Sequence, residues 1–153
     1  MRYLILENLR SAHNVGSLFR TADAAGVDKL CLLGYTPQPV DRFGRVQTTI
    51  AKTALGATNT VPWEYYESFD LLRAELRSKQ LSLVVVEQAA GAVALPAFVP
   101  PPKVAYVLGN EVTGVSDAVR SHAATIVEIP MYGTKESLNV AVAGGIILYH
   151  QRQ

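Results

Sequence analysis

The stretch LSLVVVEQAAGAVALPAFVPPPKVAYVLG, residues 81–109, decides the fold class. It holds two apolar runs, residues 81–87 and 103–109, separated by Pro96 and the triplet Pro100 to Pro102, which fit neither a helix interior nor a central strand. Apolar residues at consecutive positions are typical of parallel strands that helices cover on both faces. The stretch therefore predicts two buried strands of an α/β fold, joined by a stiff connector.

The segments on both sides of this stretch continue the alternation of strands and helices. Strands are predicted over residues 3–6, 29–34 and 124–130, and helices over residues 14–26, 68–79, 116–122 and 138–150. Residues 35–60 form a long connection with a short helix around 50–55, and loops of this length are usually functional. The order predicts a mostly parallel sheet sandwiched by helices, in a single domain over residues 1–153.

The composition excludes several classes of protein. Apolar residues make up 49% and charged residues 18% of the 153, so disorder is excluded as the main state. The 14 Lys and Arg against 13 Asp and Glu give a net charge of +1, which argues against nucleic-acid binding by bulk electrostatics. The single Cys31 excludes a disulfide scaffold and favours a buried cytosolic thiol. No apolar run approaches the roughly 20 residues of a membrane span, so we expect a cytoplasmic location and no membrane role.

Polar turns follow three of the predicted strands, at residues 8–20, 109–114 and 131–139. Parallel sheets bind ligands where their strands end at the carboxyl edge, so a nucleotide-type ligand is expected there. The GxGxxG, GxxxxGK[ST] and GxSxG patterns are all missing. His13, His122 and His150 share no metal-ligand spacing with one another or with Cys31, and no metal is predicted.

Three motifs in these turns resemble a known family. They are NVGSLFRT at 14–21 (motif 1), LGNEVTGV at 108–115 (motif 2) and IPMYGTKESLNVAVAGGI at 129–146 (motif 3). They resemble, in order and approximate spacing, the signature motifs of the SpoU/TrmH family of RNA ribose 2'-O-methyltransferases in the SPOUT superfamily. The matching positions are Asn14, Gly16, Arg20, Gly109, Glu111, Gly114, Ser137, Leu138 and Asn139.

The resemblance implies a fold, a cofactor and a catalytic set. The fold has a deep C-terminal trefoil knot that holds S-adenosylmethionine, here without an appended RNA-binding domain. Arg20 is implied as catalytic; because a guanidinium is a poor base, we expect it to stabilise the developing 2'-alkoxide and grip an RNA phosphate. Asn14, Glu111 and Asn139 complete the set, with Glu111 orienting Arg20 through a charge-assisted hydrogen bond.

The resemblance also implies a dry cofactor pocket, in which attraction between sulfonium and alkoxide is strengthened. Its expected residues are mostly apolar or small: Leu108, Gly109, Ile129, Met131, Gly133, Ser137 and Leu138. Gly109 and Gly133 are expected to let the backbone approach the cofactor closely. Structural roles are the alternatives: core packing for the apolar residues, simple turns for the glycines, solvation for Glu111, and helix capping for Asn14, Ser137 or Asn139.

RNA is the expected partner, with tRNA slightly favoured over rRNA because the compact size resembles the stand-alone members acting on tRNA. Arg42, Arg45 and Lys52 have no acid between them and are the candidate RNA-binding residues, with a plain solvated loop as the alternative. The final helix is apolar on more than one face, which predicts a homodimer through the knot region or, equally, a central core helix. Two other functions are weighed: a non-catalytic knotted module that binds RNA or a partner, and an unknotted nucleotide-binding α/β domain.

Overall fold

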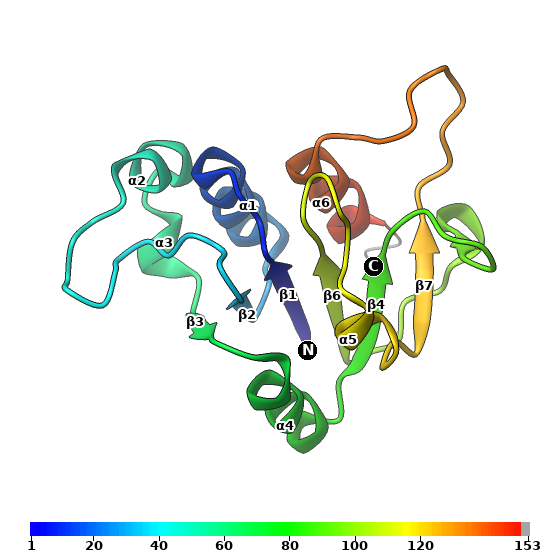
Figure 1. The fold of residues 1–153 in the computed structure, drawn as a ribbon, viewed down its shortest axis with the longest axis horizontal. Helices are drawn as coiled ribbons and strands as arrows, with labels where there is room; N and C mark the ends of the chain where they lie inside the picture. The colour runs from blue at the N-terminus through cyan, green and yellow to red at the C-terminus, as the bar shows by residue number, and fades with distance from the viewer. Residues whose placement is uncertain (151–153) are drawn as a thin grey trace.

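The computed structural model describes residues 1–150, which form a seven-stranded parallel sheet with helices on both faces (Figure 1). The strands are β1 (Arg2–Glu7), β2 (Lys29–Leu33), β3 (Trp63–Tyr66), β4 (Ser82–Val86), β5 (Val93–Ala94), β6 (Val104–Leu108) and β7 (Thr125–Glu128). Their spatial order is β3-β2-β1-β6-β4-β7-β5, and every ladder between them is parallel.

The order in which strands are added to the sheet changes side at β1. From β1 the chain moves outward through β2 to β3, whereas β6, β4, β7 and β5 all lie on the other side of β1. Leu6 of β1 pairs with Leu32 of β2 and with Leu108 of β6, so the carboxyl ends of the three strands are level. The turns after β1 and β6 therefore emerge side by side, at the kind of switch point where open parallel sheets bind ligands.

Each face of the sheet has its own apolar core, because successive side chains of a strand point to opposite faces. Leu4 and Leu6 of β1 belong to the core beneath helices α1 (Ala12–Ala25), α2 (Thr48–Ala54), α3 (Ala57–Thr60) and α6 (Val140–Tyr149). Tyr3 and Ile5 belong to the core beneath α4 (Phe69–Lys79) and α5 (Asp117–Arg120). This two-sided burial is why the strands are apolar at consecutive positions.

The predicted fold class is confirmed, with differences in detail. The sequence reading missed β3, α3, β5 and a single 3-10 turn at Leu95–Ala97. Helix α1 begins before the predicted position, because the Ser11 hydroxyl accepts the backbone N–H of Asn14 at 3.1 Å and caps the helix. The capping role considered for Asn14 is therefore wrong. Cys31 is fully buried as expected, and no helix within residues 1–150 is long and apolar enough to cross a bilayer.

The last helix lies against α1 with one of its faces open. Figure 1 shows the segment after β7 extending away from the sheet and returning to α6 beside α1. A Cβ on Gly144 would lie 2.4 Å from the Leu18 side chain and 3.0 Å from that of Leu108, and Ile147 is buried, whereas Val142 is 51% exposed. Within this chain α6 is therefore not a central core helix buried all round.

Candidate functional site

A pocket of about 510 Å³ lies at the carboxyl ends of β4, β6 and β7 and is called the motif pocket below. Its walls come from the ends of those strands, from motif 2, and from the segment of motif 3 that leads into α6. Six of the predicted cofactor residues line it: Leu108, Gly109, Ile129, Met131, Ser137 and Leu138. Gly133 is exposed and is not part of the lining, so the structure does not bring it into the pocket.

Motif 2 lines this pocket as a turn folded tightly on itself. Asn110 and Gly114 exchange backbone hydrogen bonds of 3.1 and 3.0 Å, and the Asn110 Oδ1 atom accepts the N–H groups of Val112 and Thr113. A Cβ atom on Gly109 would lie 2.4 Å from backbone atoms of Gly114 and Val115. Glycine is thus required because the turn approaches itself, and its role in the approach of a ligand stays a prediction.

Two acidic residues support motif 2 from neighbouring strands, and the sequence reading missed both. Glu87, just after β4, accepts the N–H of Val115 at 3.1 Å and pairs with Arg120 at 2.9 Å. Glu7, at the end of β1 and only 4% exposed, accepts the N–H of Ser116 at 2.9 Å. The sequence does carry a signal for such a residue, because a glutamate ends an otherwise apolar strand in LSLVVVE.

Glu111 joins motif 2 to the beginning of α1. Its carboxylate accepts the backbone N–H of Arg10 at 3.0 Å and of Ser11 at 3.2 Å. Burial raises the pKa of Glu111, but these backbone donors and the Asn14 amide outweigh it, and the pKa lies below its ordinary value. Within residues 1–150 no hydrogen bond or ion pair joins Glu111 to Arg20, so the expected orienting bond between them is wrong. The carboxylate holds the helix start instead.

Asn14 and Asn139 connect motif 1 to motif 3. Asn139 caps α6, its Oδ1 accepting the N–H groups of Ala141 at 2.9 Å and Val142 at 3.4 Å. Its Nδ2 donates to the Oδ1 of Asn14 at 3.2 Å, and Asn14 is 9% exposed. Of the two capping candidates for this helix, Asn139 is thus the cap, and it also lies against motif 1. Three of the four predicted catalytic residues meet here, at the edge of the motif pocket.

Arg20 stands apart from this cluster. Its side chain is exposed, whereas Phe19 and Ala22 of the same helix are buried against the sheet. Arg20 does not line the motif pocket. Among residues 1–150 it makes no hydrogen bond or ion pair. Its guanidinium is free to contact a partner molecule.

The candidate RNA-binding residues are partly gathered. The guanidinium carbons of Arg42 and Arg45 lie 4.8 and 5.0 Å from the centre of the Phe43 ring, and Arg45 pairs with Asp41 at 2.7 Å. Lys52 is exposed in the last turn of α2. No group of three or more His, Cys, Asp or Glu side chains that could hold a metal occurs within residues 1–150.

Comparison with known proteins places this site in a family. Residues 1–149 match the model of the SpoU rRNA Methylase family. The chain belongs to this family. It is 34% identical over 151 residues to the 23S rRNA (guanosine-2'-O-)-methyltransferase RlmB of Neisseria meningitidis serogroup B, covering 98% of this chain and 57% of that protein. The corresponding protein of Bordetella pertussis is 35% identical over 153 residues, and this chain covers 60% of it. The SpoU chain thus spans less than two thirds of these curated relatives.

Solved structures agree with the family assignment. The AdoMet-bound rRNA methyltransferase from Sinorhizobium meliloti superposes with a TM-score of 0.86 at 27% identity, over 97% of this chain and 54% of that one. The A. aeolicus TrmH/SpoU tRNA modifying enzyme gives a TM-score of 0.83 at 27% identity, over 97% and 72% of the two chains. The resemblance of the three motifs to the SpoU/TrmH family is confirmed.

Proposed function

We propose that this SpoU-family chain is the catalytic domain of an S-adenosylmethionine-dependent RNA ribose 2'-O-methyltransferase. The observation that carries the proposal is the motif pocket, because all three motifs meet at it or at its edge. Membership of the family and the likeness to the AdoMet-bound rRNA methyltransferase support it.

The lining of the motif pocket fits an adenosyl cofactor. Leu108, Ile129, Met131 and Leu138 supply apolar surface, while Ser137 and the backbone of motif 2 supply polar groups. Its volume of about 510 Å³ lies within the roughly 300–1,000 Å³ of small-molecule sites, and the carboxylates of Glu87, Glu111 and Glu136 also line it, as suits a ligand that carries positive charge. When bound, S-adenosylmethionine supplies a methyl group on a positively charged sulfur.

The chain's own residues provide position and charge. The apolar part of the lining offers a low-dielectric surface to the reacting groups, which strengthens the attraction between opposite charges. Arg20, exposed on α1 outside the pocket lining, is proposed to donate to the 2'-oxygen of an RNA seated over the pocket as that oxygen becomes negative, and to an adjacent phosphate; the hydroxyl proton passes to that phosphate or to solvent. Asn14 and Asn139 fix α1 against motif 3 and thereby fix the helix that carries Arg20.

The substrate class we propose is ribosomal RNA. The curated relatives that support this are named for a guanosine of 23S rRNA, so the slight preference for tRNA drawn from chain size is not supported. Arg42, Arg45 and Lys52 are proposed to contact this RNA through its phosphates. A cytoplasmic location belongs to the same proposal, as the site of an rRNA-modifying enzyme.

We further infer a homodimer and a C-terminal trefoil knot. The open face of α6 supports the dimer, since Val142 and Tyr149 are 51% and 52% exposed and Ile146 is 37% exposed. Light scattering at micromolar concentration tests it, and a monomer contradicts it. The knot rests on family membership, and a traced path of residues 129–150 through an earlier loop in an experimental structure is its test.

Calorimetric titration with S-adenosylmethionine tests the function directly. We expect one site per chain, and then methyl transfer to 23S rRNA fragments that exceeds transfer to tRNA transcripts. Mapping of 2'-O-methyl groups in RNA from cells with and without the protein identifies the nucleotide. Absence of cofactor binding would contradict the methyltransferase proposal and favour a non-catalytic module that binds RNA or a partner.

A further inference from the structure

Residues 40–46 form an ordered hairpin at the carboxyl end of β2, in the connection that the sequence marked as long. Val40 and Val46 pair across it as an antiparallel bridge. Asp41 organises the turn. Its side-chain Oδ1 accepts the N–H groups of Phe43 at 2.8 Å and of Arg45 at 3.0 Å, and its backbone carbonyl accepts the N–H group of Gly44 at 3.0 Å. Gly44 has a φ of 76°, which favours glycine. The turn is therefore held in one shape by its own bonds.

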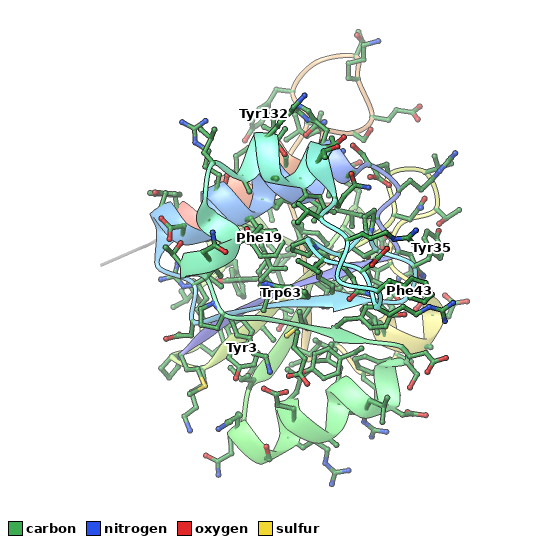
Figure 2. All side chains as sticks on the ribbon, turned by 90° about the vertical axis from the view of Figure 1, so that its left-hand side faces the viewer. Tyr3, Phe19, Tyr35, Phe43, Trp63 and Tyr132 are labelled. Atoms are coloured by element: carbon green, nitrogen blue, oxygen red, sulfur yellow. The ribbon has the colours of Figure 1, made fainter. Side chains whose placement is uncertain are left out.

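This hairpin holds an aromatic ring out in solvent between two cations. Phe43 is 67% exposed, and the guanidinium groups of Arg42 and Arg45 flank its ring. Tyr35, 63% exposed, lies at the same end of the molecule, whereas Phe19 and Trp63 pack together in the core (Figure 2). The contacts with Arg42 and Arg45 leave most of the Phe43 side chain in solvent.

A second cavity of about 510 Å³, called the hairpin pocket below, is lined by Tyr35 and by Asp41, Arg45 and Val46 of the hairpin, whereas Phe43 is not part of its lining. Tyr35 and Tyr65 contribute aromatic surface to it, and Arg45, Gln47 and Thr48 contribute hydrogen-bonding groups. Unpaired nucleotides are bound in this way: aromatic or guanidinium planes stack on the base, and amide or hydroxyl groups bond its edge. The lining of the hairpin pocket offers groups of the same kinds.

The hairpin pocket is joined to the motif pocket through one asparagine. The Asn110 Nδ2 atom donates to the hydroxyl of Tyr35 at 3.0 Å and to the carbonyl of Asn8 at 2.9 Å, and the Tyr35 N–H donates to the Asn8 Oδ1 at 3.1 Å. Asn110 lines the motif pocket and Tyr35 lines the hairpin pocket. The two cavities are therefore neighbours along one edge of the sheet.

We propose that the 40–46 hairpin binds unstacked nucleotides of the RNA substrate, next to the nucleotide that is methylated: one base stacks on the exposed Phe43 ring, and its neighbour enters the hairpin pocket against Tyr35. The inference rests on the proposed function, because it takes RNA as the substrate. It adds a base-reading site to the phosphate contacts assigned to Arg42 and Arg45. Both guanidinium groups lie within reach of a base held on the Phe43 ring.

The test compares Phe43→Leu with Phe43→Trp, because leucine keeps an apolar side chain and tryptophan keeps a ring. The probe is a single-stranded RNA of about ten nucleotides, within the usual range of such sites, titrated without S-adenosylmethionine. We expect Phe43→Leu to weaken binding about 5- to 100-fold, as loss of one stacked base does. Phe43→Trp is expected to bind like the parent, with its added fluorescence quenched by the RNA. The native Trp63, half-buried against Phe19, gives the baseline in the parent.

Salt dependence separates stacking from charge. Phe43→Leu is expected to keep the slope of log affinity against log salt, whereas Arg42→Gln lowers it by about one. Leu71→Ala, an exposed apolar residue of α4 beneath the other face of the sheet, is the matched control and keeps parent affinity. An unchanged affinity of Phe43→Leu, or an equal loss for an inorganic polyphosphate probe, overturns the proposal.

The two proposals fail separately. A chain that binds S-adenosylmethionine and methylates RNA equally well with Phe43→Leu contradicts the base-stacking site alone. A chain that shows the Phe43 effect on RNA binding but takes no cofactor contradicts the methyltransferase proposal alone.

Discussion

The motif pocket and the 40–46 hairpin lie at the same edge of the sheet but are held by opposite kinds of contact. At the motif pocket, Glu111 bonds residues 100 and 101 positions away, and Asn14 bonds a residue 125 positions away. In the hairpin, Asp41 bonds residues two and four positions away. The first region exists only when the whole sheet is assembled, whereas the second needs only its own few residues.

This difference predicts that substitutions are tolerated less well in the motif pocket than in the 40–46 hairpin. A change in the motif pocket loosens contacts between β1, β6 and α6, so it disturbs both stability and chemistry. A change in the hairpin alters only the surface presented to a substrate. Loops on a rigid scaffold commonly carry substrate selection for this reason. The pocket is thus proposed to set the reaction, and the hairpin to set the RNA.

The largest expected effect is on methyl transfer, at the residue that belongs to neither region. Arg20→Ala is expected to lower the rate about 100- to 1,000-fold, as removal of a donor to a developing oxyanion does. Arg20→Lys retains a trace, because an ammonium keeps the charge without the planar donor pair. Single-turnover methylation measures both.

Cofactor affinity is the control for this pair. Because Arg20 does not line the motif pocket, calorimetry with S-adenosylmethionine is expected to give the parent affinity for both variants. Equal rates for Arg20→Ala and the parent remove Arg20 from the mechanism.

The next largest effect is expected at Gly109. In Gly109→Ala the new Cβ meets the backbone of Gly114 and Val115 at 2.4 Å, so motif 2 must move. Overpacking of this kind costs about 1–3 kcal/mol, and displacement of the pocket wall weakens cofactor binding as well. Denaturant unfolding and calorimetry measure the two losses.

Gly133→Ala is the matched substitution. A Cβ on Gly133 meets nothing within 4 Å, so its free energy of unfolding is expected to stay within about 0.5 kcal/mol of the parent. If both glycine variants lose the same stability, the close approach of the motif 2 turn is not the reason that residue 109 is glycine.

The sequence predicts the fold where burial leaves a local pattern. The runs at β4 and β6 are apolar at consecutive positions because both faces are covered, and they were recognised for that reason. Strand β3, with the sequence WEYY, was missed because it lies at the edge of the sheet and its burial follows no simple alternation. Strand β5 has only two residues, too few for any pattern.

The site was predictable in composition but not in contacts. The family motifs predict six of the residues that line the motif pocket, yet the prediction that Glu111 orients Arg20 is wrong, because Glu111 bonds the start of α1. That bond depends on the pairing of β1 with β6, two strands separated by most of the chain. Supporting residues such as Glu87 lie outside the motifs, and only the assembled sheet reveals their role.

A smaller effect separates the two roles of Asn139. Asn139→Ala removes the cap of α6 and the bond to Asn14, and is expected to cost about 0.5–2 kcal/mol of stability. Asn139→Asp keeps a capping oxygen but has no N–H to donate to Asn14, so stability is largely retained while methyl transfer falls. Thermal unfolding and rate measurements on both variants distinguish the roles, and parent activity in Asn139→Asp contradicts a role for the Asn14 bond.

The smallest expected effect is on stability, when the carboxylate of Glu111 in the motif pocket or of Asp41 in the hairpin is replaced by an amide. The pKa of Glu111 and the pKa of Asp41 are both lowered, the latter chiefly by the backbone N–H of Arg45. A carboxylate whose folded pKa is lowered adds stability that is present above its unfolded pKa, 4.5 for Glu111, and is lost as pH falls through the folded pKa. Glu111→Gln is therefore expected to be less stable than the parent at pH 7, by under about 1 kcal/mol because the site is partly solvated, and the gap narrows below pH 4.5.

Asp41→Asn is expected to show a smaller change in stability than Glu111→Gln, despite the same direction of pKa shift. The bonds of Asp41 lie within one turn, and such local structure persists in part in the unfolded chain, so folding changes its environment less. Glu111 loses its partners entirely on unfolding, because they lie about 100 positions away. Thermal unfolding of both variants between pH 3 and 7 measures the contrast. An equal or larger loss for Asp41→Asn means that the hairpin is coupled to the rest of the fold, and that substrate reading and chemistry are not built independently.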